Sequence, residues 1–303
     1  MPETATRASL AHVLALAAER LRRSGVGDGP REAAQLWAAI AGTTPGDVWL
    51  HRDRAAPEGP AARFREAVER RASGMPFAYA VGRVSFRTLD LTLDPRALIP
   101  RPETEGLVDL VLDWCLRGKR ATENVRRGGA ERGGWGMAAD VGTGCGCIAL
   151  ALATEGRFHR VIAVERSPDA AALARENVAL VRPAVPVEVR EGDLLAPLAG
   201  ERCRVVVANP PYLTEAEYGA LDPAVREFEP RAALVSGADG LADTRAILER
   251  ARGVLNPGGL VALEIDERRA RAVRRLGDAL GWRVTVHDDL FGRARYALAR
   301  EES

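Results

Sequence analysis

Cysteine is scarce in this chain of 303 residues, which has only Cys115, Cys145, Cys147 and Cys203. Cys145 and Cys147 alone lie close together, with one residue between them and no histidine nearby. This spacing argues against zinc ligation and gives no support to redox chemistry. We therefore expect no metal site and interpret both residues as small side chains in a tight loop.

The chain also lacks a charge excess and a long apolar run. Its 43 Lys and Arg residues against 42 Asp and Glu residues give a net charge of +1. Such a balance predicts no general attraction to nucleic acid or to a membrane surface. No stretch approaches the roughly 20 apolar residues that span a bilayer, and none at the amino terminus has the pattern of a signal peptide. We expect a cytoplasmic location.

The length leaves room for two hydrophobic cores. Apolar residues recur at helical spacing over 5–24, 30–41 and 60–72, and Pro30 suits a first helical position. These helices predict a small amino-terminal helical domain over 1–75. Alternating Val84, Phe86, Leu89 and Leu91 then predict a hairpin inside a linker over 76–103.

The remaining residues, 104–303, predict an α/β catalytic domain. After an amphipathic helix ending near residue 116, the stretch 117–136 is basic and glycine-rich, and we expect a flexible insertion. Apolar runs at 138–141, 161–164, 187–189, 205–208 and 260–265 alternate with helical patterns at 148–153, 168–181 and 244–255. This alternation predicts a parallel sheet with helices on both faces. The last two runs, 282–286 and 295–299, have no helix between them and should be antiparallel.

A glycine-rich loop follows the first of these runs. It reads Asp140-Val141-Gly142-Thr143-Gly144-Cys145-Gly146. Glycines allow a sharp turn and close approach to a ligand, and the helix that follows offers free amide groups. The spacing differs from the dinucleotide fingerprint, which lowers the case for a nicotinamide or flavin enzyme.

Two acidic residues stand at later strand ends. Glu165 can accept hydrogen bonds from both hydroxyls of a ribose, and Asp193 can accept from an exocyclic amine. Leu194 can cover an adenine face. These signals occur in order along the chain, and S-adenosylmethionine fits them better than a dinucleotide does.

Asn209-Pro210-Pro211-Tyr212 follows the run at 205–208. The Asn209 side-chain carbonyl and the Pro210 backbone carbonyl can accept the two hydrogens of a planar amino group and raise the electron density on its nitrogen. The prolines restrict the backbone, and Tyr212 can stack on the planar group. These residues predict an amino-group methyltransferase in which Asn209, Pro210 and Tyr212 act at the reacting nitrogen.

Over about residues 76–300, the chain resembles the release-factor glutamine methyltransferases of the HemK/PrmC type. The resemblance is carried by 98–105 (Leu-Ile-Pro-Arg-Pro-Glu-Thr-Glu), the glycine loop, Asn209 to Tyr212, 225–231 (Val-Arg-Glu-Phe-Glu-Pro-Arg) and 239–241 (Asp-Gly-Leu). It implies a seven-stranded, Rossmann-like class I methyltransferase domain and an amino-terminal helical domain that recognises release factors. The implied activity is N5-methylation of the glutamine in their Gly-Gly-Gln motif, which supports translation termination.

Residue by residue, the resemblance implies that Gly142 to Gly146, Glu165, Leu194 and Asn209 contact the cofactor. It places Asn209 to Tyr212 against the substrate glutamine, with Phe86 as a further residue lining its pocket. Two positions depart from the family pattern: Cys145 stands where a hydroxyl residue is common, and Glu165 stands where aspartate is commoner. Both substitutions keep the chemistry.

Other functions share some of these features. A DNA or RNA adenine-N6 methyltransferase would use the same acceptor motif, but the neutral charge and the lack of an added nucleic-acid-binding module disfavour it. A ribosomal-protein glutamine methyltransferase could differ only in the amino-terminal domain. A nucleotide-binding module without catalysis is disfavoured by the intact Asn209 and Pro210, and an oxidoreductase by the glycine spacing. We expect release factors as partners, with no direct need for nucleic acid or a membrane.

Overall fold

The computed structural model describes residues 8–123 and 134–301, with 118–123 described as helical backbone only. Their contacts divide the chain into two units. The first unit runs to Arg83 and includes Pro223–Phe228, and the second contains Val84–Asp222 and the residues from Glu229 onward. Among the residues described, no helix is long and apolar enough to cross a membrane.

The first unit is a small helical bundle. Its helices are α1 (Leu10–Arg23), α2 (Gly29–Ala41), α3 (Pro45–Leu50), α4 (Glu58–Ala72), α5 (Phe77–Val81) and α10 (Pro223–Phe228). Capping residues set three of the starts, because Ser9 accepts from the His12 N–H, Asp28 from the Arg31 N–H and Thr44 from the Asp47 N–H. The fully buried Leu21, Leu36 and Phe64 form its core.

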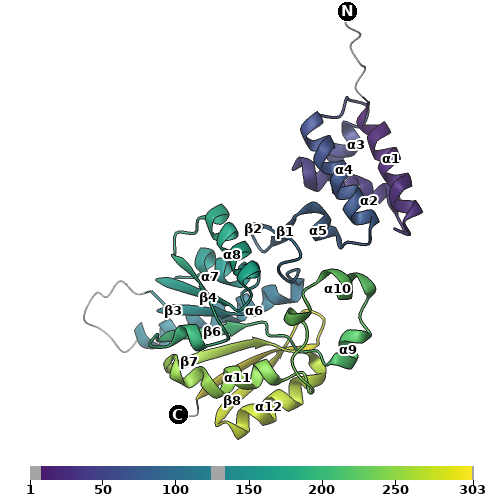
Figure 1. The fold of residues 1–303 in the computed structure, drawn as a ribbon. Coiled ribbons are helices and arrows are strands. Elements are labelled where there is room, and N and C mark those ends of the chain that lie inside the picture. The colour runs from purple at the N-terminus through teal and green to yellow at the C-terminus, as the bar shows by residue number, and fades with distance from the viewer. Residues whose placement is uncertain (1–7, 124–133, 302–303) are drawn as a thin grey trace, which may run out of the picture. The chain divides into compact units, whose positions relative to one another are not determined.

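The second unit is built on a seven-stranded sheet of order β5-β4-β3-β6-β7-β9-β8 (Figure 1). The strands are β3 (Met137–Val141), β4 (Arg160–Glu165), β5 (Val187–Glu191), β6 (Cys203–Ala208), β7 (Leu255–Glu264), β8 (Trp282–Asp288) and β9 (Ala294–Glu301). The first five pair in parallel, and β9 is antiparallel to both β7 and β8. The predicted α/β fold class and the antiparallel last pair are confirmed.

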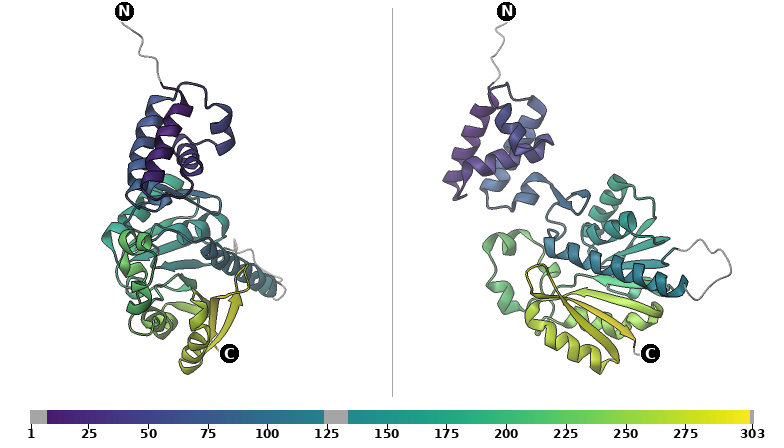
Figure 2. Two further views of the ribbon diagram at one scale, coloured as in Figure 1. Left: turned by 90° about the vertical axis from the view of Figure 1, so that its right-hand side faces the viewer. Right: turned by 180° about the vertical axis from the view of Figure 1, so that it is seen from behind.

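Helices cover both faces of this sheet (Figure 2). On one side lie α6 (Pro102–Glu123), α7 (Cys147–Glu155) and α8 (Pro168–Val181); on the other lie α11 (Ala242–Arg250) and α12 (Ala270–Ala279). The hairpin of β1 (Arg83–Phe86) and β2 (Leu89–Thr92) packs on α8. Two short helices, α9 (Glu215–Gly219) and α10, follow β6 in the chain.

Two predicted helix boundaries in the second unit were wrong. Helix α6 continues to Glu123, past the predicted end near 116, so the backbone of 117–123 is helical. The rest of the predicted insertion over 117–136 falls largely outside the described residues. The helix predicted over 244–255 ends at Arg250, because a 3-10 turn over Ala251–Gly253 leads directly into β7.

The order of the strands creates a switch point between β3 and β6. From β3 the chain moves outward to β4 and β5, whereas β6 starts the other half of the sheet. Val141 pairs with Ala208, so the residues that follow, Gly142 and Asn209, leave neighbouring strands at the same edge. Open α/β sheets bind ligands at this point.

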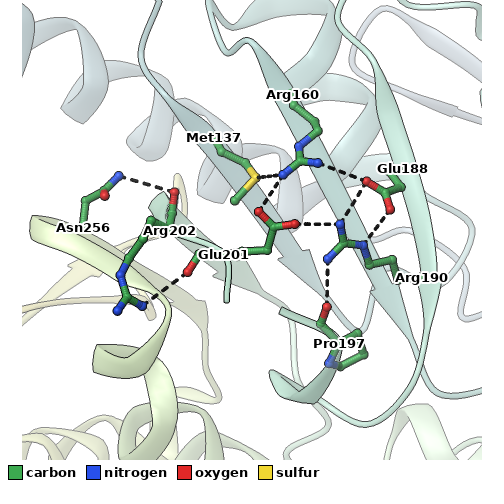
Figure 3. Close-up of polar contacts among 8 residues, drawn as sticks. All are labelled: Met137, Arg160, Glu188, Arg190, Pro197, Glu201, Arg202 and Asn256. Carbon is green, nitrogen blue, oxygen red and sulfur yellow. Dashed lines mark hydrogen bonds and ion pairs between the residues drawn. The ribbon is translucent and has the colours of Figure 1, made fainter. Parts of the chain in front are cut away.

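Charged side chains protect the edge strand β5 and fix the connection that follows it (Figure 3). Glu201 accepts from Arg160 at 2.6 Å and from Arg190 at 2.7 Å, and Arg190 also donates to the Pro197 carbonyl at 2.9 Å. Charges on an edge strand discourage pairing with another chain. The same contacts hold the 192–202 connection, which carries Leu194, against the sheet.

Candidate cofactor and acceptor site

A cavity of about 170 Å³ lies in the second unit at the carboxyl ends of β3, β4, β5 and β6. The loop after β3 contributes Gly142, Thr143, Gly144 and Cys145 to its wall. Later strand ends contribute Glu165, Leu194, Asn209, Pro210 and Pro211. The structure therefore brings the glycine loop and the acceptor motif to one cavity.

Five of the predicted site residues do not line this cavity. Asp140 is fully buried beneath the glycine loop, and Phe86 is buried at the end of β1. Gly146 is the residue before α7, Asp193 is exposed, and Tyr212 is half-buried after Pro211. Their ligand contacts stay predictions.

The glycine loop has a backbone that favours glycine. Gly142, Gly144 and Gly146 have φ values of 74°, 56° and 88°, in the region that other residues rarely adopt. Asp140 ties the loop to α7, because its Oδ2 accepts from Thr143 Oγ1 at 2.5 Å and from the Ala149 N–H at 3.0 Å. Burial raises the pKa of Asp140 to about 7.

Glu165 joins two neighbouring segments of the cavity wall. One carboxylate oxygen accepts from the Gly144 N–H and the other from the Ser167 N–H, both at 2.9 Å. Each oxygen of a carboxylate has two lone pairs, so both retain capacity for a further hydrogen bond. The side chain is thus held in place and still able to accept from a ribose diol.

Leu194 completes an apolar part of the wall. Its φ is 46°, which is unusual for a residue with a branched side chain. Strained backbone of this kind persists where the surrounding structure enforces it, and it concentrates at ligand sites. Leu194 packs against the core of the sheet. Together with Glu165, it gives the cavity wall an apolar surface beside carboxylate oxygens that can still accept hydrogen bonds.

Two of the four cysteines, Cys145 and Cys147, line the cavity. All four are free and buried. A hydrogen bond with Cys145 and burial raise the pKa of the Cys147 thiol well above its ordinary value, so this thiol stays protonated. Across residues 8–123 and 134–301, no group of three or more His, Cys, Asp or Glu side chains could hold a metal ion.

Sequence reasoning missed a polar chain beside Asn209. The Asn209 Nδ2 donates to Thr104 Oγ1 at 3.2 Å, and Thr104 Oγ1 donates to Glu264 at 2.7 Å. Thr104 lines the cavity, and Glu264 is the last residue of β7. A signal was present, because Glu264 is the one charged residue in the otherwise apolar run 260–265.

The segments quoted for the family resemblance also contact one another. Arg101 donates to both oxygens of the buried Glu229, at 2.7 and 2.8 Å. Gly240 has a φ of 71°, and a side chain there would collide with the Tyr212 carbonyl and with Arg269. Glycine at 240 therefore permits the close packing that holds the chain just after the acceptor prolines.

Similarity to known proteins extends over both units. The family model "PrmC N-terminal domain" matches residues 12–82, and the model "Methyltransferase small domain" matches 131–228. The solved structure of the hMettl16 catalytic domain in complex with MAT2A 3′UTR hairpin 6 is 17% identical with a TM-score of 0.51, covering 80% of this chain and 82% of that one. This likeness concerns the fold alone.

Two curated relatives are similar over nearly their whole length. A release factor glutamine methyltransferase from Deinococcus radiodurans is 37% identical over 291 residues, covering 96% of this chain and 98% of the relative. The one from Moorella thermoacetica is 39% identical over 301 residues, covering 97% and 100%. Since both the fold and the near full-length identity agree, this chain belongs to the family of release factor glutamine methyltransferases.

Proposed function

We propose that this protein methylates the side-chain amide nitrogen, N5, of the glutamine in the Gly-Gly-Gln motif of peptide chain release factors. The observation that supports this most is the position of Asn209, Pro210 and Pro211 in the same cavity wall as the glycine loop and Glu165. Methyl donor and acceptor amide can therefore meet at one sheet edge, and family membership supplies the substrate class.

Some residues of the cavity would hold the methyl donor, S-adenosylmethionine, and others would orient the acceptor amide of the glutamine. Glu165 would accept hydrogen bonds from the ribose of S-adenosylmethionine, the backbone of the glycine loop would approach the cofactor closely, and Leu194 would cover the adenine. S-adenosylmethionine supplies an electrophilic methyl group on a sulfonium. Asn209 Oδ1 and the Pro210 carbonyl accept the two amide hydrogens of the glutamine, which fixes its nitrogen for attack. The new carbon–nitrogen bond would form as the carbon–sulfur bond breaks, leaving a neutral thioether. The positively charged nitrogen would then lose one proton to solvent, so no general base would be needed before attack.

We infer that the first unit recognises the release factor. Its helical bundle matches the family's amino-terminal domain model, whereas all the cavity-lining residues lie in the second unit. We infer that no nucleic acid is required, because the chain has a net charge of only +1. The amino-terminal domain would also determine whether the enzyme binds release factors or a ribosomal protein as its substrate.

The test is methyl transfer from labelled S-adenosylmethionine to purified release factors, wild type and with the motif glutamine replaced. We expect label only on the wild-type factor, located at the glutamine by mass spectrometry. DNA and ribosomal protein serve as alternative acceptors in the same experiment. Methylated adenine, or methylated ribosomal protein with unmodified release factors, would refute the proposal.

Asn209→Ala should separate the two functions of the cavity. Removing an oriented acceptor at the reacting centre typically lowers a rate by ~10²–10³-fold. We expect that loss in single-turnover methylation, with the affinity for S-adenosylmethionine nearly unchanged in calorimetry. An equal collapse of cofactor affinity would instead make Asn209 a cofactor-binding residue.

A further inference from the structure

Asn209 is the last member of a hydrogen-bonded chain that begins at a buried carboxylate. Glu264 and Thr104 are each 2% exposed, and they come from β7 and from the first turn of α6. Thr104 Oγ1 lies 2.7 Å from Glu264 Oε2 and 3.2 Å from Asn209 Nδ2. Burying a carboxylate costs free energy, so the position of Glu264 beside the acceptor motif indicates a function other than packing.

The direction of this chain follows from the donors and acceptors themselves. An ionised carboxylate can only accept, so the single hydroxyl hydrogen of Thr104 is committed to Glu264. The Thr104 oxygen can then only accept from Asn209, which requires Nδ2 on that side. With the amide turned by half a rotation, Asn209 Oδ1 would face the Thr104 oxygen with no hydrogen between them. The carbonyl oxygen is therefore left on the other side of the amide group.

We propose that Thr104 and Glu264 are positioning residues, which hold Asn209 so that its Oδ1 accepts from the glutamine amide. This inference rests on the proposed function. It adds that the acceptor motif is oriented by residues outside itself. A fixed carbonyl stabilises the positive charge that develops on the nitrogen without having to reorient during the reaction. The negative charge of Glu264 strengthens the same chain.

The ionisation of Glu264 should govern this orientation. Burial raises its pKa to about 7, although the hydrogen bond from Thr104 and the positive charge of Arg295 lower it, and the charge of Glu103 raises it further. Tyr212 and Tyr296 also face this carboxylate, and burial raises the pKa of both phenols, so they stay neutral near pH 7. A protonated Glu264 can donate to Thr104 and free its hydroxyl hydrogen for Asn209 Oδ1, which inverts the chain.

Three threonine variants test the positioning. Thr104→Val keeps the shape and removes the hydroxyl, Thr104→Ser keeps the hydroxyl, and Thr154→Val is the matched control on α7, where the hydroxyl bonds only to helix carbonyls. Misplacement of a reacting group by about 1 Å can cost ~10²-fold in rate, so we expect Thr104→Val to lose roughly 10- to 100-fold in single-turnover rate. The single-turnover rate of Thr104→Ser should stay within a few-fold of the wild-type rate, and that of Thr154→Val should equal the wild-type rate.

Binding and pH dependence distinguish positioning from a merely structural role. Thr104→Val should bind S-adenosylmethionine and the release factor with near-normal affinity in calorimetry. In the wild type the rate should fall as the pH is lowered through about 7, and Glu264→Gln should remove that inflection. A full rate in Thr104→Val, equal losses in Thr104→Val and Thr104→Ser, or an unchanged inflection in Glu264→Gln would each overturn the inference. A full rate in Asn209→Ala would overturn the acceptor role of Asn209 and this inference with it, whereas release factors left unmodified by the wild type would overturn the proposed function on which the inference rests.

Discussion

At the scale of single residues, Glu165 carries the clearest prediction about cofactor affinity. Its carboxylate is held by the Gly144 and Ser167 N–H groups and can still accept from a ribose. Hydrogen bonds to a charged group contribute about 1.5–3 kcal/mol, so Glu165→Ala should weaken S-adenosylmethionine binding roughly 10- to 150-fold. Calorimetry measures this change directly.

Glu191→Ala provides the matched control for that variant. Glu191 also ends a strand, but it pairs with Arg175 on the surface and does not line the cavity. Its removal should leave the cofactor affinity unchanged. Equal affinities in wild type and Glu165→Ala would remove Glu165 from the cofactor site.

Asp140 should make the stability of the protein depend on pH. Burial raises its pKa from 3.8 to about 7, so the folded state binds this proton more tightly than the unfolded state does. The stabilising contribution is complete below about pH 4 and is lost as the pH rises through 7, a difference of roughly 4 kcal/mol. Asp140→Asn keeps an acceptor oxygen for Thr143 and Ala149, and it should flatten this dependence. Urea unfolding at pH 5 and pH 8 tests it; parallel curves for both proteins would contradict the assignment.

The sequence could place many residues on the cavity wall for a simple reason. Gly142, Leu194 and Asn209 follow strands and Glu165 ends one, and parallel strands end at one edge of a sheet. The Asn209–Thr104–Glu264 chain could not be found in this way. Thr104 and Glu264 are separated by 160 residues, and only the packing of α6 against β7 brings them together.

At the scale of elements, one buried side chain connects three of them. Asn177 of α8 accepts from the Thr92 N–H at 2.8 Å and donates to the carbonyls of Thr92 and Cys145 at 2.9 Å each. It therefore joins the β1–β2 hairpin and the glycine loop to α8. Asn177→Leu would leave these buried backbone groups without partners, at a cost of roughly 2–4 kcal/mol in the free energy of unfolding.

The same variant should also affect the cofactor, because the Cys145 carbonyl belongs to the glycine loop. We expect a lower urea midpoint together with weaker S-adenosylmethionine binding. Asn256→Leu is the control, since its exposed amide makes only a 3.4 Å contact with the Arg202 carbonyl. A loss of stability no larger than in this control would show that the three elements are held together by other contacts.

Several long helices with apolar residues at helical spacing were predicted, whereas a short helix and an arginine-rich helix were missed. Helix α8 was predicted over 168–181 and spans Pro168–Val181, where Ser167 accepts from the Ala170 N–H. Helix α3 was missed although Thr44 and Asp47 form a capping box, because it has only 6 residues. Helix α12 was missed because its sequence is rich in arginine, and only Val273 and Gly277 are buried.

At the scale of the whole molecule, each of the two units has a hydrophobic core of its own, as the sequence pattern predicts. Leu36 and Phe64 belong to the core of the helical bundle, whereas Val206 and Leu263 belong to that of the sheet. The first part of the sequence has apolar residues at helical spacing, and the later part has short apolar runs that alternate with helical patterns. This change predicted the α/β class of the second unit, because the apolar residues of a helix and of a strand are buried with different spacings. The sequence could not predict that 223–228 belong to the first unit, since that grouping depends on contacts between residues far apart in the sequence.

This organisation predicts that S-adenosylmethionine stabilises the two units unequally. All the cavity-lining residues belong to the second unit, so binding should slow its hydrogen exchange. At about 100 times the Kd, a ligand adds roughly 2.7 kcal/mol to the unit that binds it, which slows exchange through unfolding of that unit ~100-fold. Peptides from α1, α2 and α4 should exchange at unchanged rates, and Glu165→Ala should need far more ligand for the same protection. Equal slowing in both units would show that they unfold together, and that the cofactor site stabilises the helical bundle as well.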